Sequence, residues 1–382
     1  MATPITGAIS LSQVNTELGL SSTAAISFND TLYRQLTNQL SGAATLGDAR
    51  AAASVNSTTT NLNVLTGLFS SSSTVTNYKV LVRSGVSVGC TAGNTALTLG
   101  QFATGSTIVI NNYGTVSGYG GTGGTSGVGS SGGDAINANY ANQTVTINNQ
   151  TGATLRGGGG GGGRGGSGGT GGTGGQGYYT YNSAQQYNRG KGGLYYWQET
   201  AGKGGSSYDN KWNSAQVGGA GPVGATTLNG YNRGSYAAYD HKTGLTYYYI
   251  MQIQYAYTSG GAGGAGGAGG SGGRGQGYDG ANASGSVGTG GSGGAAGGTN
   301  AGTGGTGGTG GTGGAGALYG AAGSTGVTGN TGSTGATGNY TGGSAGAGGV
   351  TGSAGGASGR YLVKGANSVT LNNSGTVQGG LA

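Results

Sequence analysis

The chain has 382 residues, of which 101 are glycine, against a usual glycine content of roughly 7%. Charged residues make up 6%, where an ordinary globular domain carries about 25%, and hydrophobic residues including alanine reach only 33%. This composition excludes an average enzyme built around a large aliphatic core. The formal net charge is +7, but the cations are spread along the chain and form no phosphate-neutralising cluster, so we expect no nucleic-acid partner.

The cysteine count and the lengths of the apolar runs exclude several further classes of protein. Cys90 is the only cysteine, so the chain has neither an intrachain disulfide nor a cysteine-built zinc site. The first residues lack a basic stretch followed by an apolar one, so we expect no secretory signal. No apolar run approaches the roughly 18 residues that a membrane-spanning helix needs. We expect neither a metal ion nor a cofactor.

Residues 1–53 are expected to form a small helical module. Ser12 is suited to cap a helix over residues 13–18, Asn29 or Asp30 to cap a second, and residues 48–53 permit a third. Each helix has one apolar stripe and too few residues to bury it alone, so we expect the module to dock on another protein. The residues expected to make this attachment are Leu11, Val14, Leu18, Leu32, Leu36 and Leu40.

Residues 54–117 are predicted to form a linker, over 54–77, and then a β connector. In the connector, Val80, Val82, Val86 and Val88 alternate as expected for strands with one buried face. A pattern of a β-branched strand, an Asn-Asn corner and a second short strand occurs three times. The copies begin at Thr107, Thr144 and Ser368, and the last lies in the C-terminal closing strands expected over 360–382. Matched corners indicate a folded repeat, because asparagine suits sharp turns.

Residues 118–359 are dominated by glycine tracts with a period of three. The threonines at 303, 306, 309 and 312, for example, are separated by glycine pairs. A helix has a period of 3.6 and a strand a period of 2, whereas polyproline II has three residues per turn, a geometry that polyglycine can share. Ordering glycine costs roughly 1–2 kcal/mol per residue, so such segments are stable only if most amides find partners in neighbouring segments. The alternative is a disordered low-complexity chain.

Residues 178–257 interrupt the glycine tracts and hold 15 of the 24 tyrosines and both tryptophans. Tyrosine and tryptophan among serine, glycine and asparagine is the composition of antibody binding loops. We therefore expect several loops that recognise a partner, although the rings could instead only cover a scaffold that lacks a core. The expected contact residues are Tyr178, Tyr179, Tyr181, Tyr195, Tyr196, Trp197, Trp212, Tyr231, Tyr247, Tyr248 and Tyr249.

The residues of common catalytic sites are scarce, and we expect no enzyme. His241 is the only histidine and lies in a polar segment with no supporting motif. The insert offers Glu199, Asp209 and Asp240 for a glycoside-cleaving pair, which needs two positioned acids. The G-X-T run over residues 323–338 leaves a short collagen-like trimer as a structural alternative. A line of threonines at period three leaves a second, an ice-binding polyglycine bundle.

Glycine tracts with an aromatic insert resemble the tip adhesins of long tail fibres in T-even-like bacteriophages. The N-terminal sequences from Ile9 to Gly19 and from Ile26 to Asp30 are also similar to openings of phage tail proteins. The resemblance implies a sandwich of polyglycine II helices with receptor-binding loops. The expected fold is thus mostly irregular and β: a helical attachment module, a β connector, a polyglycine II helix bundle over 118–359 with projecting aromatic loops, and closing strands.

The function that this resemblance implies is that of a non-enzymatic receptor-binding adhesin in a phage virion. The expected partners are a tail or fibre protein at the N-terminus and a bacterial outer-membrane protein or surface glycan at the loops. The protein would be synthesised in the host cytoplasm, and it would act as one copy on a trimeric fibre tip or as a homotrimer. The alternatives are a self-associating structural fibre or decoration protein and an enzyme acting on surface glycans.

Overall fold

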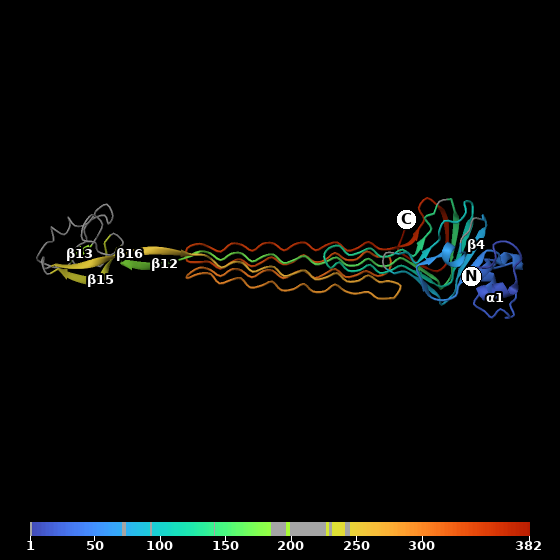
Figure 1. Cartoon of the computed structure of the whole chain (residues 1–382), viewed down its shortest axis with the longest axis horizontal. Helices are drawn as coiled ribbons and strands as arrows, with labels where there is room; N and C mark the ends of the chain where they lie inside the picture. The colour runs from blue at the N-terminus through green and yellow to red at the C-terminus, as the bar shows by residue number, and fades with distance from the viewer. Residues whose placement is uncertain are drawn as a thin grey trace.

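The computed structural model describes residues 2–70, 74–91, 94–140, 142–184, 196–198, 227–228, 231–240 and 245–382; the side chains of 180–255 are not described. The chain is mostly β and irregular with few helices, as predicted. Both termini, the helices and most strands form a body at one end (Figure 1). A narrow bundle of extended segments connects this body to a second group of strands at the other end (Figure 1).

The body is built around a solenoid of three parallel sheets. Successive coils each contribute one strand to each sheet, and the sheet orders are β1-β4-β7-β10-β18, β2-β5-β8-β11-β19 and β3-β6-β9-β17-β20. The first two coils contain β1 (Ala52–Val55), β2 (Thr59–Thr60), β3 (Leu62–Asn63), β4 (Asn77–Val82), β5 (Ser87–Gly89) and β6 (Leu97–Thr98). The other three contain β7 (Thr107–Asn112), β8 (Thr115–Ser117), β9 (Ile136–Asn137), β10 (Thr144–Asn149), β11 (Thr154–Arg156), β17 (Arg360–Val363), β18 (Ser368–Asn373), β19 (Thr376–Gln378) and β20 (Gly380–Leu381).

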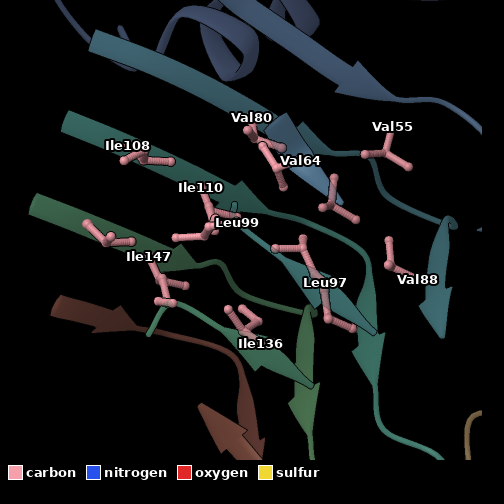
Figure 2. Packing of buried hydrophobic residues seen from close by; sticks show 14 of the residues in the cluster. Val55, Val64, Val80, Val88, Leu97, Leu99, Ile108, Ile110, Ile136 and Ile147 are labelled. Carbon is pink, nitrogen blue, oxygen red and sulfur yellow. The ribbon is translucent and has the colours of Figure 1, made fainter. Parts of the chain in front are cut away.

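Alternating apolar residues of the three sheets fill the interior of the solenoid. The predicted alternation of Val80, Val82, Val86 and Val88 is confirmed, because all four side chains are buried in this core. Figure 2 shows Ile108, Ile110 and Ile147 from the first sheet converging with Leu97 and Ile136 from the third. The repeat is also confirmed: its three copies are β7–β8, β10–β11 and β18–β19, stacked in register.

The N-terminal helices pack on the outer face of the first sheet. Helices α1 (Leu11–Glu17) and α2 (Thr31–Thr37) form a second apolar cluster with the sheet residues Ala52 and Leu81. Leu81 points outward because it lies between two inward-facing valines of β4. The apolar stripes of the helices are therefore covered by the chain's own sheet, whereas the sequence led us to expect that another protein covers them.

The helix boundaries differ from those predicted. Ser10 caps α1 in place of Ser12, because its Oγ accepts from the backbone N–H of Gln13 in a capping box. Asp30 is the N-cap of α2, but Asn38 adopts the left-handed conformation and ends this helix before Leu40. Residues 46–49 form a short 3-10 helix, and β1 replaces the rest of the expected third helix. The expected linker contains α3 (Val64–Leu68).

The glycine tracts form the bundle as extended segments joined by backbone hydrogen bonds. Residues 157–177 run through its centre, and consecutive amides bond in different directions. The N–H groups of Gly159, Gly160 and Gly161 donate to Gln276, Ala321 and Ser130, in three separate segments. The pattern repeats every three residues, so each turn donates to three neighbours over residues 159–164 and to two neighbours, 259–277 and 321–338, from Gly165 onward. The bonded neighbours of the central segment are 118–124, 127–133, 259–277, 301–317, 321–338 and 342–359.

The central segment is richest in glycine where it has the most neighbouring segments. Over residues 157–163 every position is glycine, and there the hairpin 118–133 covers one side of the segment. A Cβ on Gly161 would lie 2.0 Å from the carbonyl oxygen of Thr122. The hairpin ends beside Arg164, whose N–H donates to Gly127. From there every third position carries a side chain, namely Arg164, Ser167, Thr170, Thr173 and Gln176.

Candidate functional site

The aromatic insert lies at the end of the bundle farthest from both termini (Figure 1). Its described residues form an antiparallel sheet, whereas loops were expected from the sequence. The sheet order is β12-β16-β15-β14, and β13 also pairs with β16. The strands are β12 (Gly177–Ala184), β13 (Tyr196–Gln198), β14 (Thr227–Leu228), β15 (Tyr231–Asp240) and β16 (Leu245–Thr258).

Strand pairing brings several predicted contact residues into neighbouring register positions. Tyr196 pairs with Tyr249, and Trp197 pairs with Tyr248. Tyr247 also belongs to this part of β16, opposite Gln198. Five of the predicted residues therefore share one region of the sheet.

The other predicted contact residues are placed differently. Tyr231 pairs with Leu228 on the outermost strand pair, and Tyr181 lies on β12 opposite Gln254. Tyr195 and Trp212 lie outside the described residues. Tyr178 and Tyr179 lie at the base of the insert, where β12 leaves the bundle, and Tyr179 is 40% exposed.

Two turns at the far end of the bundle contact the base of the insert. The Asn339 side chain donates from Nδ2 to the carbonyl of Tyr178 at 2.9 Å and accepts at Oδ1 from the N–H of Tyr178 at 2.7 Å. Asn300 Nδ2 donates to the same carbonyl at 3.0 Å. The Tyr340 ring lies 6.2 Å from that of Tyr178 and 4.9 Å from that of Tyr257. Tyr340 and Tyr257 nevertheless stay 54% and 61% exposed.

The sequence interpretation did not identify Asn300, Asn339 or Tyr340 as site residues. The available signal was the interruption of the three-residue glycine period, at residues 298–301 and 339–341. An interruption predicts a turn between segments. It does not predict which part of the chain lies beside that turn.

The predicted attachment residues divide into buried and exposed groups. Val14, Leu18 and Leu36 are fully buried in the cluster between the helices and the first sheet, so the prediction is wrong for them: they cannot contact a tail protein in this fold. Leu32 packs partly buried against the same cluster. Leu11 and Leu40 are 42% and 54% exposed, and for them attachment stays a prediction.

Charged and aromatic side chains also meet where the bundle joins the solenoid. Arg274 forms an ion pair with Asp279 at 2.8 Å and lies over the ring of Tyr119, while Arg156 lies 3.6 Å above the ring of Tyr319. These contacts connect the two parts at the end opposite the insert.

Within the part of the chain that the structure describes, no group of three metal-ligating side chains comes together, and no helix is long and apolar enough to cross a membrane. His241 lies outside this part. Cys90 is buried in the solenoid core, and burial raises the pKa of its thiol to about 11.

Comparison with known protein families identifies one to which the chain is similar. The sequence profile of the family described as phage tail fibre adhesin Gp38 matches residues 50–284, from the first coil of the solenoid through the insert into the bundle. No curated protein and no solved structure matches the chain. Because the matched range covers more than half of the sequence, the chain belongs to the Gp38 family of phage tail fibre adhesins.

Proposed function

We propose that this protein is the receptor-binding tip of a T-even-like long tail fibre, carried in the virion and without enzymatic activity. The observation that carries the proposal is the position of the Tyr- and Trp-rich insert, at the end of the bundle and far from both termini (Figure 1). Tyrosine and tryptophan dominate binding energies at protein interfaces. A bacterial outer-membrane protein or a surface glycan is the partner that fits a tail fibre adhesin.

We also propose that the bundle is a sandwich of polyglycine II helices. The support is the three-residue repeat of its hydrogen bonds. Donors at Gly162, Gly165 and Gly168 reach acceptors at Gly273, Gly270 and Gly267, so the register steps by three on both segments. Three residues per turn is the polyglycine II period. Such a scaffold would limit the ordering cost that the insert incurs on binding.

Replacing the insert by a short turn tests the receptor-binding role. Asn182 and Ile253 are register partners, so residues 183–252 can be replaced by Asn-Gly, which closes an antiparallel pair. We expect the purified variant to lose binding to host cells, measured by fluorescence on intact bacteria, while its circular dichroism keeps the solenoid signal. Val287→Ser, on a 79% exposed bundle residue, is the control that should bind normally. Unchanged cell binding by the shortened variant contradicts the proposal.

Attachment to the tail is proposed for the N-terminal module, because it lies at the end opposite the insert (Figure 1). Leu11 and Leu40 are the exposed leucines of this module. Leu11→Asp with Leu40→Asp should lower the amount of adhesin in purified virions, measured by immunoblot, and leave cell binding of the free protein unchanged. Normal incorporation of this variant would place the attachment surface elsewhere.

A further inference from the structure

The base of the insert is held on the outer side of β12 by an asparagine side chain. The amide of Asn339 both donates to and accepts from the backbone of Tyr178, which is the pattern of a strand residue in an antiparallel pair. Asn300 adds a second donor to the Tyr178 carbonyl from the other turn. Three side-chain hydrogen bonds therefore converge on one backbone residue of the insert.

The same two turns also contact the second strand that enters the insert. Tyr178 and Tyr257 are paired in register, and the ring of Tyr340 contacts both of their rings. Thr258 Oγ1 donates to the carbonyl of Thr299 at 2.7 Å. Both strands are thus connected to the turns 298–301 and 338–341, which we call the clamp.

Within the clamp, the side chains of Asn339, Asn300 and Tyr340 contact the insert, whereas Thr341 Oγ1 accepts from the N–H of Gln176 in the central segment. The bundle is joined mainly by backbone hydrogen bonds, to which hydroxyls such as Ser333 Oγ add further acceptors. The side-chain bonds of Asn339, by contrast, run to Tyr178 in the insert. The Tyr340 and Tyr257 rings are more than half exposed, so their contact is not part of a buried core. A glycine-rich turn would close the segments equally well.

We propose that Asn339, Tyr340 and Asn300 are positioning residues that fix the orientation of the insert on the bundle for receptor binding. Joined to the bundle by two strands alone, the insert would sample many orientations, and binding would select one of them at an entropic cost. Hydrogen bonds and ring contacts to both strands limit this motion. The proposal rests on the receptor-binding role of the insert.

The test compares Asn339→Ala and Tyr340→Ala with the unaltered protein and with Val287→Ser. We expect each clamp variant to weaken the apparent Kd for host cells about tenfold, which corresponds to losing one or two hydrogen bonds or a ring contact. Amide exchange should accelerate at residues 178–179 and 256–258 and stay unchanged at 162–175. Tyr340→Phe keeps the ring and should restore most of the binding lost in Tyr340→Ala.

Three results overturn the positioning role. Normal binding by both alanine variants contradicts it directly, even when removal of residues 183–252 abolishes binding. Accelerated exchange over 162–175 shows that the residues stabilise the bundle as a whole. Asn339→Asp puts a carboxylate oxygen in place of the amide donor, beside the Tyr178 carbonyl, so binding equal to that of the unaltered protein contradicts the hydrogen-bond argument. If removing residues 183–252 has no effect on binding, the proposed function itself fails.

Discussion

Glycine acts in the bundle mainly by lacking a Cβ atom. Gly280 and Gly320 adopt positive φ at turns, but Gly162 and Gly166 within the central segment do not. A Cβ on Gly162 would lie 1.9 Å from the carbonyl oxygen of Gly314, and one on Gly166 would lie 1.7 Å from that of Val350. The segments are therefore too close for any side chain at these positions, whatever its backbone preference.

Gly162→Ala should destabilise the bundle, whereas Gly290→Ala should not. The first Cβ would overlap a backbone oxygen that only a shift of a whole segment can move, with an expected loss of at least the 1–3 kcal/mol typical of overpacking. At Gly290 no heavy atom lies within 4 Å of the added Cβ, so we expect no loss or a gain of about 0.4–1 kcal/mol. Thermal unfolding of the two variants measures the difference, and equal melting temperatures contradict the close packing.

Cys90 should be unreactive in the native protein. Its side chain is fully buried, its Sγ accepts from the N–H of Tyr119 at 3.0 Å, and burial raises its pKa to about 11. At pH 8 the thiolate, which is the reactive form, is therefore only about a thousandth of the total. An aromatic disulfide reagent should react within minutes in denaturant and far more slowly in buffer. Rapid labelling of the native protein would contradict the burial of this side chain.

At the scale of elements, the Asn-Asn corners form two ladders across the coils. Asn112, Asn149 and Asn373 make the inner ladder, with Nδ2 to Oδ1 distances of 2.8 Å at both steps. Asn111, Asn148 and Asn372 make the outer one, also with 2.8 Å steps. The sequence predicted the corners from the turn preference of asparagine. The ladders add a second role, since each side chain connects consecutive coils.

Asn149→Ala should destabilise the solenoid more than Asn372→Ala. Asn149 is almost fully buried and bonds to both neighbouring coils, so its loss leaves buried polar groups without partners, at about 1–3 kcal/mol each. Asn372 lies at the exposed end of its ladder with one bond, to Asn148. Urea unfolding followed by circular dichroism compares the two variants. Equal midpoints would contradict a larger contribution from the buried Asn149.

The sequence predicted best those elements whose residue pattern depends on local chemistry alone. The valines of β4 and β5 and the three repeat copies follow from alternation and turn chemistry. The helix ends were less accurate, because Ser10 and Ser12 are both acceptable caps and the capping box with Gln13 decides between them. β1 was missed because its residues are buried on both faces and show no alternation.

At the scale of the whole molecule, the bundle consists of insertions into two coils of the solenoid: the hairpin 118–133 lies between β8 and β9 of the third coil, and the remaining segments interrupt the fourth. β11 ends at Arg156 and β17 begins at Arg360, and both belong to the fourth coil. The strands on both sides of this insertion belong to the solenoid, so the solenoid holds both ends of the inserted chain. This arrangement holds the glycine segments at one end through a conventional apolar core, while the clamp joins them to the insert at the other.

Amide exchange should distinguish the central segment from the edge of the bundle. Residues 159–175 donate to several neighbouring segments, whereas residues 281–297 bond only to 259–277 and 301–317. We expect strong protection at Gly162, Gly165 and Gly168 and weaker protection along 281–297, because opening the centre breaks contacts with more segments. Central amides that exchange as fast as those of an unstructured peptide would contradict a rigid bundle.

The sequence alone determined the features that depend on local chemistry: the period of three, the buried valine faces, the asparagine corners and the aromatic enrichment of the insert. The tertiary structure decided which segments are neighbours, that the first sheet covers Val14, Leu18 and Leu36, and that Asn339 reaches Tyr178. The physical reason is that the bundle segments recognise one another through backbone groups. Those groups are the same in every glycine tract, so the sequence carries little information about their pairing.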